Sequence, residues 1–337
     1  MANPTEKHAE TTESPVRFDV VGDALASLRI GGSLLLRESY APPWSVAVPG
    51  APRLVELLGV DAKIRVVAFH LVEFGHCEIE SERGDKVELT AGEMAVCFDG
   101  EAHRISQGRR ARVQTFESLM AGANQRKALG GESTSLLCGA FLLQQTDLNP
   151  LFAALPGLMR ASLSRPGQLH NLSGVARLMA EEIDRRSPGG GYIVGRLLEI
   201  LCAEAVRAHI ESAPHEAAGW IRAVTDPIVG RAIAAIHARP GQTWSVKELA
   251  SEVAMSPSRF AARFSEALGT PPMAYVVQWR MNVARRKLAG SRQSIDQVAT
   301  EIGYESPAAF VRAFKREVGE SPAAWRARES GRRNATN

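Results

Sequence analysis

Four side chains that could bind a metal ion or a polar effector lie in the first third of the chain: His70, His76, Cys77 and His103. Imidazole and thiolate groups are the usual ligands of zinc-like ions, and an open metal site needs at least three protein ligands. The residues therefore suggest an effector pocket, with a bound metal as an open alternative. A simpler alternative is that they occupy ordinary turn and strand positions.

A second group of side chains, near the C-terminal end, has the chemistry that reads nucleic acid. The group combines basic, hydroxyl and small side chains: Ser258, Arg259, Ala262, Arg263, Ser306, Ala308, Arg312, Lys315 and Arg316. Arg312 is the candidate base reader, because Arg can donate two hydrogen bonds to guanine O6 and N7. The other basic residues are expected to contact backbone phosphates. Any one of them taken alone would be an ordinary solvated residue.

This second group lies on a stretch that repeats itself. Ser256, Pro257, Phe260, Phe264 and Gly269 recur 50 positions later as Ser306, Pro307, Phe310, Phe314 and Gly319. Upstream apolar residues recur at a shift of 49, so the second turn holds one extra residue. A short apolar helix, a turn and a capped second helix form a helix-turn-helix, here duplicated. At 100° per residue, the phenylalanines face inward and the candidate DNA contacts face outward. A long helix over 273–288 is expected to connect the copies, with Arg285 exposed.

The second copy reads Ala299-x3-Gly303-Tyr304-x5-Phe310-x3-Phe314-Lys315-x3-Gly319-x-Ser321-Pro322-x2-Trp325-Arg326. This stretch resembles the C-terminal domain of AraC/XylS-family transcription regulators. The resemblance implies seven helices, with two recognition helices that enter successive major grooves of double-stranded DNA. It also implies RNA polymerase as a partner and a sensor domain that answers to a small-molecule effector.

The N-terminal part has a different texture, with short strand-like segments broken by Gly, Pro and charged turns. They are 33–37, 44–48, 64–73, 76–80, 87–89, 94–98, 112–119 and 136–143. Such segments favour a sandwich or a barrel. The segment from Gly92 to His103 resembles the second motif of the cupin barrel, with Phe98 where Pro is usual. The upstream cupin motif, two His one residue apart and a Glu, is not intact.

The fold class we predict is α+β multidomain: a cupin-like β-barrel with appended helices, then an all-α domain with two helix-turn-helix motifs. Its parts are a disordered lead-in (1–15), the cupin-like sensor (16–149), a helical hairpin (150–211), a linker (212–224), the DNA-binding domain (225–327) and a tail (328–337). The hairpin either packs internally or makes a homodimer. The alternative function is a metal-dependent cupin enzyme fused to a DNA-binding domain; otherwise we expect no cofactor.

Charge is divided unevenly along the chain. Residues 1–224 carry 23 Lys/Arg and 27 Asp/Glu, whereas residues 225–337 carry 17 and 10. The basic C-terminal part indicates a polyanionic partner. No run approaches the roughly 18 apolar residues of a membrane span, and the N-terminus lacks a signal peptide's apolar stretch. We expect a cytoplasmic protein without membrane contact, whose four widely spaced cysteines are free thiols.

Overall fold

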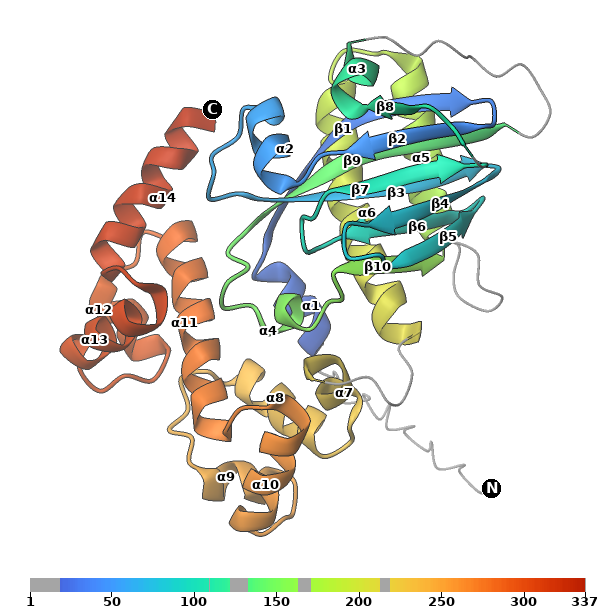
Figure 1. Cartoon of the computed structure of the whole chain (residues 1–337). Coiled ribbons are helices and arrows are strands. Elements are labelled where there is room, and N and C mark those ends of the chain that lie inside the picture. Colours follow the sequence, from blue (N-terminus) through green and yellow to red (C-terminus); the bar gives the residue numbers. More distant parts are fainter. Residues whose placement is uncertain (1–18, 109, 122–132, 163–170, 213–218, 337) are drawn as a thin grey trace, which may run out of the picture.

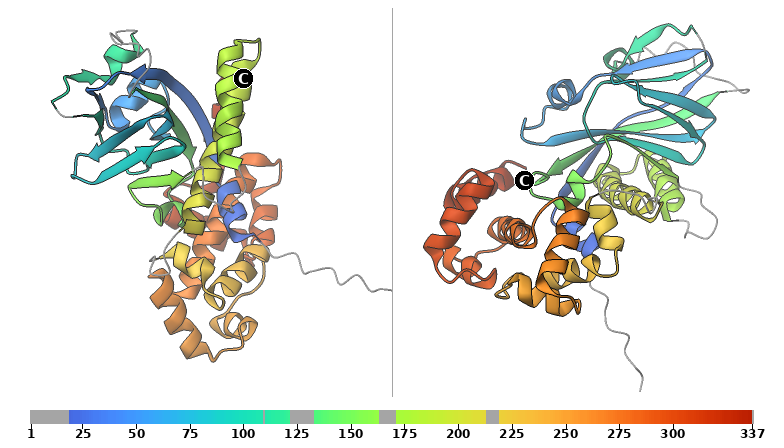
Figure 2. Two further views of the ribbon diagram at one scale, coloured as in Figure 1. Left: turned by 90° about the vertical axis from the view of Figure 1, so that its right-hand side faces the viewer. Right: turned by 60° about the horizontal axis from the view of Figure 1, so that its bottom comes forward.

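The computed structural model describes residues 19–108, 110–121, 133–162, 171–212 and 219–336. A β-sandwich lies beside an all-helical domain, and a helical hairpin covers one face of the sandwich (Figures 1 and 2). The predicted lead-in, 1–15, lies outside the described residues.

The described strands form two five-stranded sheets. Sheet A has the order β1 (Arg29–Tyr40), β9 (Thr134–Gln144), β3 (Arg65–Phe74), β6 (Glu93–Cys97) and β10 (Leu158–Ser162). Sheet B has the order β5 (Lys86–Thr90), β4 (His76–Ser81), β7 (His103–Gln107), β2 (Trp44–Val48) and β8 (Val113–Thr115). The pairs are antiparallel except β2 and β8, which are parallel. Of the two architectures that the strand pattern favours, the structure has the sandwich.

Strand β3 is apolar at nearly every position because sheet A is covered on both faces. Ala68 and Val72 belong to the core between the two sheets, whereas Val67 and Phe69 belong to the core on the outer face. Alternate residues of a strand point to opposite faces, so this division follows from the pleat. By the same alternation, His70 points between the sheets.

The outer face of sheet A is covered by α5 (Asn171–Arg185) and α6 (Gly190–Ser212), which form the predicted hairpin (Figure 2). The segment predicted as a helical hairpin, 150–211, also contains a strand that was not predicted. After α4 (Pro150–Ala153), the chain forms β10 and pairs with β6. Met159 and Ala161 are buried while Arg160 is exposed, and this period of two is that of a strand.

Other boundaries of the N-terminal part also differ from expectation. The predicted strand at 112–119 is the short β8 followed by α3 (Phe116–Met120), because the Thr115 side chain caps that helix. Helix α1 (Val20–Ala26) is shorter than the helix that the apolar pattern from Asp19 to about Ile30 predicts, because β1 already begins at Arg29. Helix α2 (Ala51–Leu58) and strand β7 were not predicted.

The C-terminal domain is helical: α7 (Trp220–Thr225), α8 (Val229–Ala238), α9 (Val246–Glu252), α10 (Pro257–Leu268), α11 (Pro272–Gly290), α12 (Ile295–Glu301), α13 (Pro307–Val318) and α14 (Pro322–Thr336). Helix α7 occupies part of the predicted linker, 212–224. It belongs to this domain because buried Trp220 donates a hydrogen bond to the Tyr275 hydroxyl, at 2.9 Å. The predicted tail, 328–337, is helical as far as Thr336. No described helix is long and apolar enough to cross a membrane.

Candidate nucleic-acid interface

The two helix-turn-helix motifs are α9–α10 and α12–α13, and α11 runs between them (Figure 1). Each first helix begins at a serine cap: the backbone N–H of Glu248 donates to Ser245 Oγ, and that of Gln297 donates to Ser294 Oγ. At Ser294 the Gln297 side chain also accepts from the backbone of the cap, which completes a capping box. These caps fix where α9 and α12 start.

The phenylalanines of the repeat are fully buried, as predicted. Phe260 and Phe264 pack with ring centroids 5.5 Å apart, and Phe310 and Phe314 pack at 5.6 Å. Because the phenylalanines anchor one face of α10 and of α13, the opposite faces must point away from the core. Helices α10 and α13 thus each present an outer face to solvent, at equivalent positions in the two motifs.

On α10, the outer face carries exposed Ser258, Arg259 and Ala262. Arg263 is less free, because its Nη2 lies 2.6 Å from Asp226 Oδ2. Burial raises the pKa of Asp226, but the backbone N–H groups of Val229 and Ile228 and the Arg263 guanidinium outweigh it, so the pKa falls below its usual range. Arg263 therefore holds a structural ion pair at the start of α8.

On α13, the outer face is more basic. Arg312, Lys315, Arg316 and Ala308 are exposed, and Arg316 Nε lies 2.8 Å from Glu317 Oε1. Ser306 has a structural role, because its Oγ accepts the backbone N–H of Ala309 and caps the helix. Arg312, the predicted base-edge donor, thus lies on the solvent side of the second recognition helix.

Contacts around α11 hold the two motifs in one arrangement. Arg280 donates hydrogen bonds to the carbonyl oxygens of Pro240 and Gln242, at 2.9 and 2.7 Å. A Cβ at Gly303 would lie 2.5 Å from the Gly241 carbonyl oxygen. The loop before the first motif therefore packs directly on the turn of the second.

Arg285 was expected to be exposed, and this prediction is wrong. The side chain is buried against the Trp325 ring, 4.4 Å from its centroid, because α14 folds over α11. Burial lowers the pKa of the Arg285 guanidinium to about 10. Arg285 is thus a packing residue, and periodicity on α11 alone does not reveal the covering helix.

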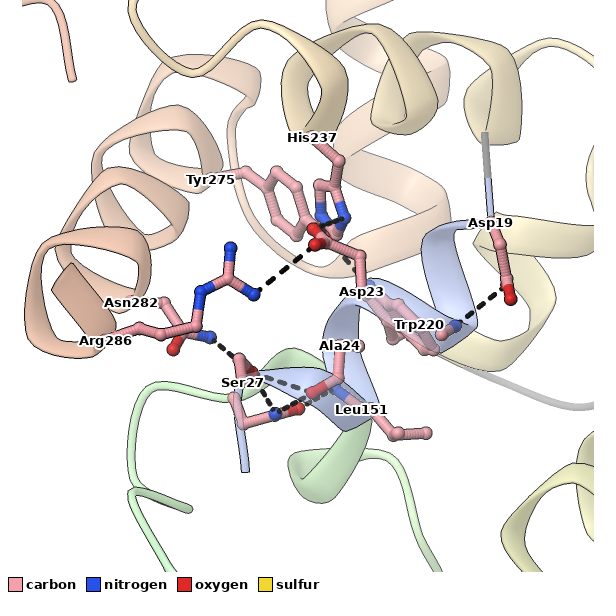
Figure 3. A network of polar contacts seen from close by, with 12 residues as sticks. Asp19, Asp23, Ala24, Ser27, Leu151, Trp220, His237, Tyr275, Asn282 and Arg286 are labelled. Atoms are coloured by element: carbon pink, nitrogen blue, oxygen red, sulfur yellow. Dashed lines mark hydrogen bonds and ion pairs between the residues drawn. The ribbon is translucent and has the colours of Figure 1, made fainter. Parts of the chain in front are cut away.

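A polar network joins the sandwich side to the helical domain through α1 (Figure 3). Asp23 Oδ2 lies 3.4 Å from His237 Nδ1, and Asp23 Oδ1 lies 3.5 Å from Arg286 Nη1. Because the Asp23 carboxylate only accepts, the proton of His237 lies on Nδ1, and His237 Nε2 accepts from the Tyr275 hydroxyl at 2.9 Å, while that hydroxyl accepts from Trp220.

A second polar contact of α1 lies deeper in the same junction. Asn282 of α11 donates to Ser27 Oγ at 3.2 Å, and Asn149 donates to the same oxygen at 2.8 Å. All three residues are buried. No local sequence pattern indicates this junction, since its partners are up to 263 positions apart.

Two of the four predicted effector-pocket residues meet inside the sandwich. His70 Nε2 and His103 Nε2 are 2.7 Å apart, and both rings are buried. Two cysteines that the prediction did not include lie beside them: Cys138 Sγ is 3.1 Å from His70 Nδ1, and Cys97 Sγ is 3.7 Å from His103 Nε2. Burial lowers the pKa of both histidines, so both are neutral near pH 7.

The other two predicted pocket residues, His76 and Cys77, line a separate open groove of about 640 Å³. Its remaining walls are polar, including Glu78, Lys86 and Glu88. Burial raises the pKa of the Cys77 thiol to about 12. An oxidant-sensing thiol needs a lowered pKa and access to solvent, so the geometry does not favour that role here.

Known protein families match both the N-terminal and the C-terminal parts of the chain. A family described as Cupin matches residues 19–211, and one described as Helix-turn-helix domain matches residues 249–328. The HTH-type transcriptional regulator AlkR of Acinetobacter baylyi is 30% identical over 280 residues, which cover 80% of this chain and 89% of that protein. The RCS-specific HTH-type transcriptional activator RclR of Escherichia coli K12 is 24% identical over 266 residues, covering 79% and 86%.

Among solved structures, the DNA-binding domain of AdpA in complex with a target DNA is 34% identical and covers 33% of this chain and 98% of that one, with a TM-score of 0.31. The relatives are transcriptional regulators, not enzymes. The chain therefore belongs to the AraC family of DNA-binding transcriptional regulators, with an N-terminal cupin domain and a C-terminal helix-turn-helix domain.

Proposed function

We propose that α10 and α13 enter successive major grooves on one side of double-stranded DNA, and that α13 supplies the main base-reading side chain. The observation that carries this is the outer face of α13, where Arg312, Lys315 and Arg316 are exposed opposite the buried phenylalanines. On α10, Ser258 and Ala262 allow close approach to the groove, and Arg259 supplies a phosphate contact.

The test is a map of bound sites across the source genome, followed by fluorescence anisotropy on the best site and on a scrambled duplex. We expect tighter binding to the mapped site, with an affinity that falls steeply as salt rises. Equal affinity for both duplexes at moderate salt, with the folded protein and with candidate effectors present, would overturn the proposal.

We further infer that a small effector or signal at the cupin domain modulates this binding, in a cytoplasmic complex that includes RNA polymerase. The polar contacts of α1 with α8 and α11 support such coupling, because any shift of α1 must disturb Asp23 and Ser27 against their partners in the DNA-binding domain. Replacing Asp23 with Asn should alter the affinity for the mapped site, while Asp19→Asn, at the other end of α1, should not.

The hairpin α5–α6 is our proposed homodimer contact. Its helices expose four large apolar side chains, Leu178, Tyr192, Ile193 and Ile200, at 52, 73, 45 and 47% of their full surface. Large apolar side chains this exposed on one helix pair suit a surface that a partner covers. Sedimentation at micromolar concentration should show a dimer that Ile200→Glu weakens. A monomeric parent protein would contradict the proposal.

A further inference from the structure

The interior of the sandwich holds a cluster of soft metal ligands, contributed by both sheets. His70 on β3 and Cys97 on β6 belong to sheet A, and His103 on β7 faces them from sheet B. One ligand atom from each lies within 4.8 Å of the others, and all three side chains are buried. Two imidazoles and a thiol that converge from three strands form a small N₂S ligand set.

The protons in this cluster can be assigned from its hydrogen bonds. The Glu101 carbonyl oxygen only accepts, so His103 Nδ1, 3.0 Å away, carries the ring proton and its Nε2 holds a lone pair. His70 Nε2–H must then donate to His103 Nε2, and His70 Nδ1 accepts the Cys138 thiol proton. Carbonyl and thiol partners of this kind orient ligand histidines in metal sites.

Charge balance selects the kind of cation. A fully buried site disfavours any net charge, because ions are poorly solvated in an apolar core. A monovalent cation with the Cys97 thiolate and two neutral imidazoles is neutral, whereas a divalent cation leaves one positive charge uncompensated. Thiolate and imidazole also suit Cu(I), while structural zinc prefers a fourth ligand. Cys138 lies on the far side of the His70 ring, so it positions that ring and is not a ligand.

We propose that His70, Cys97 and His103 bind one Cu(I) ion, and that this ion is a signal for the regulator. Binding releases one proton to solvent, from the Cys97 thiol. The proton on His70 Nε2 moves to Nδ1, which then donates to Cys138 Sγ, and the cysteine keeps its own proton. The second half of the proposal rests on the proposed function, whereas the metal site itself does not.

Occupation of the site would change the sandwich. Two nitrogens bound to one ion at about 2 Å each, in trigonal geometry, lie roughly 3.5 Å apart. The present separation of the two Nε2 atoms is 2.7 Å. The rings of β3 and β7 must therefore move apart on binding, and these two strands belong to different sheets. Binding of the ion should therefore increase the separation of the two sheets at this point.

The test is an anaerobic Cu(I) titration of metal-free, full-length protein without DNA, in competition with a chromophoric Cu(I) chelator. We expect one ion per chain, and an affinity that rises about tenfold per pH unit because one proton is released. Cys97→Ser and His103→Gln should lower the affinity by more than the roughly 10–100-fold that loss of an outer partner costs. Cys77→Ala, another buried thiol of the same core, is the matched control and should bind normally.

X-ray absorption on the parent protein gives a readout that does not depend on the variants' folding: one sulfur and two nitrogen ligands are expected. No tight Cu(I) binding, or binding that Cys97→Ser leaves unchanged, overturns the site. Tight Zn²⁺ binding with no Cu(I) preference overturns the monovalent assignment. Operator affinity measured with and without the ion separates the two proposals. Sequence-specific DNA binding that ignores a bound ion removes only the signalling role. Absence of specific binding removes the proposed function and, with it, the signalling role, but leaves the metal site in place.

Discussion

The two helix-turn-helix copies have equivalent buried residues but different residues on their outer faces. At a shift of 50 positions, Arg312 of α13 corresponds to Ala262 of α10, and Lys315 corresponds to Ser265. Arg263 of α10 corresponds in turn to buried Ala313. The buried phenylalanines preserve how each helix is presented, so the copies dock alike while their contacts differ. The small side chains of α10 suit close approach to DNA, whereas the basic side chains of α13 suit hydrogen bonds and ion pairs with it.

The turns differ for a related reason. Ala254 in the first copy and Gly303 in the second both have positive φ, at 54° and 82°. Gly303 also lies against another backbone, that of Gly241. The second turn therefore carries a backbone contact that sets the two motifs against each other.

The largest test of the shared interior is Phe310→Ala beside Phe260→Ala. Each removes a fully buried ring, so each should lower the free energy of unfolding by about 3–5 kcal/mol. Urea unfolding can be followed by tryptophan fluorescence, since Trp220, Trp244, Trp279 and Trp325 all belong to the C-terminal domain. A loss well below this range in one copy only would show that the two interiors are not equivalent.

The turns provide the next test, Gly303→Ala beside Ala254→Gly. The first should cost about 1–3 kcal/mol of stability, because an alanine at positive φ is strained and its Cβ meets the Gly241 carbonyl. The second should be neutral or slightly stabilising, since glycine adopts this φ freely. The same urea assay measures both. Equal effects at the two positions would contradict the asymmetry.

Much of the helical domain was predictable from sequence because its signals are local. Phe260 and Phe264 lie one helical turn apart, and the capping box joins Ser294 to Gln297, three residues later. The predicted burial of the phenylalanines is confirmed. Long-range features failed: Arg285 looks like an exposed basic residue until α14 covers it.

The group of His and Cys side chains inside the sandwich shows the same limit, because its members are far apart in the sequence. His70 and His103 were predicted as pocket residues and do meet, but their neighbours Cys97 and Cys138 were missed. Which cysteine faces a histidine depends on the register between paired strands: within sheet A, β3 and β9 place His70 opposite Cys138, at a separation of 68 residues. His76 and Cys77, adjacent on β4, instead line a groove that does not include His70 or His103.

The different outer faces of α10 and α13 predict that substitutions on them have different effects on DNA binding. Arg312→Ala should weaken binding to the mapped site by about 1–3 kcal/mol and relax specificity at one base pair. Arg259→Ala, which removes an exposed arginine from the outer face of the first copy, should weaken binding to every sequence alike and reduce the salt slope by about 1. Anisotropy on a set of single-base variants distinguishes them. If Arg312→Ala binds as tightly and as selectively as the parent, the assignment of α13 is wrong.

The smallest effect concerns the ion pair that occupies Arg263. Asp226→Asn keeps an oxygen that can accept the Ile228 and Val229 N–H groups but removes the charge opposite Arg263. The pKa of Asp226 is lowered in the folded state, so its contribution is complete above the unfolded value of about 3.9 and is lost as pH falls through the folded value. We expect a loss below about 1 kcal/mol, constant between pH 8 and pH 5, in urea unfolding.

Asp226→Ala, which also removes the cap, should cost about 1 kcal/mol more. A difference between parent and Asp226→Asn that changes between pH 8 and pH 5 would point to another titrating group. The released Arg263 should then raise affinity for scrambled DNA slightly, since a freed guanidinium on α10 can reach phosphate. If that affinity does not change, the pair serves only to hold α8, and the exterior of the first copy is passive toward DNA at this position.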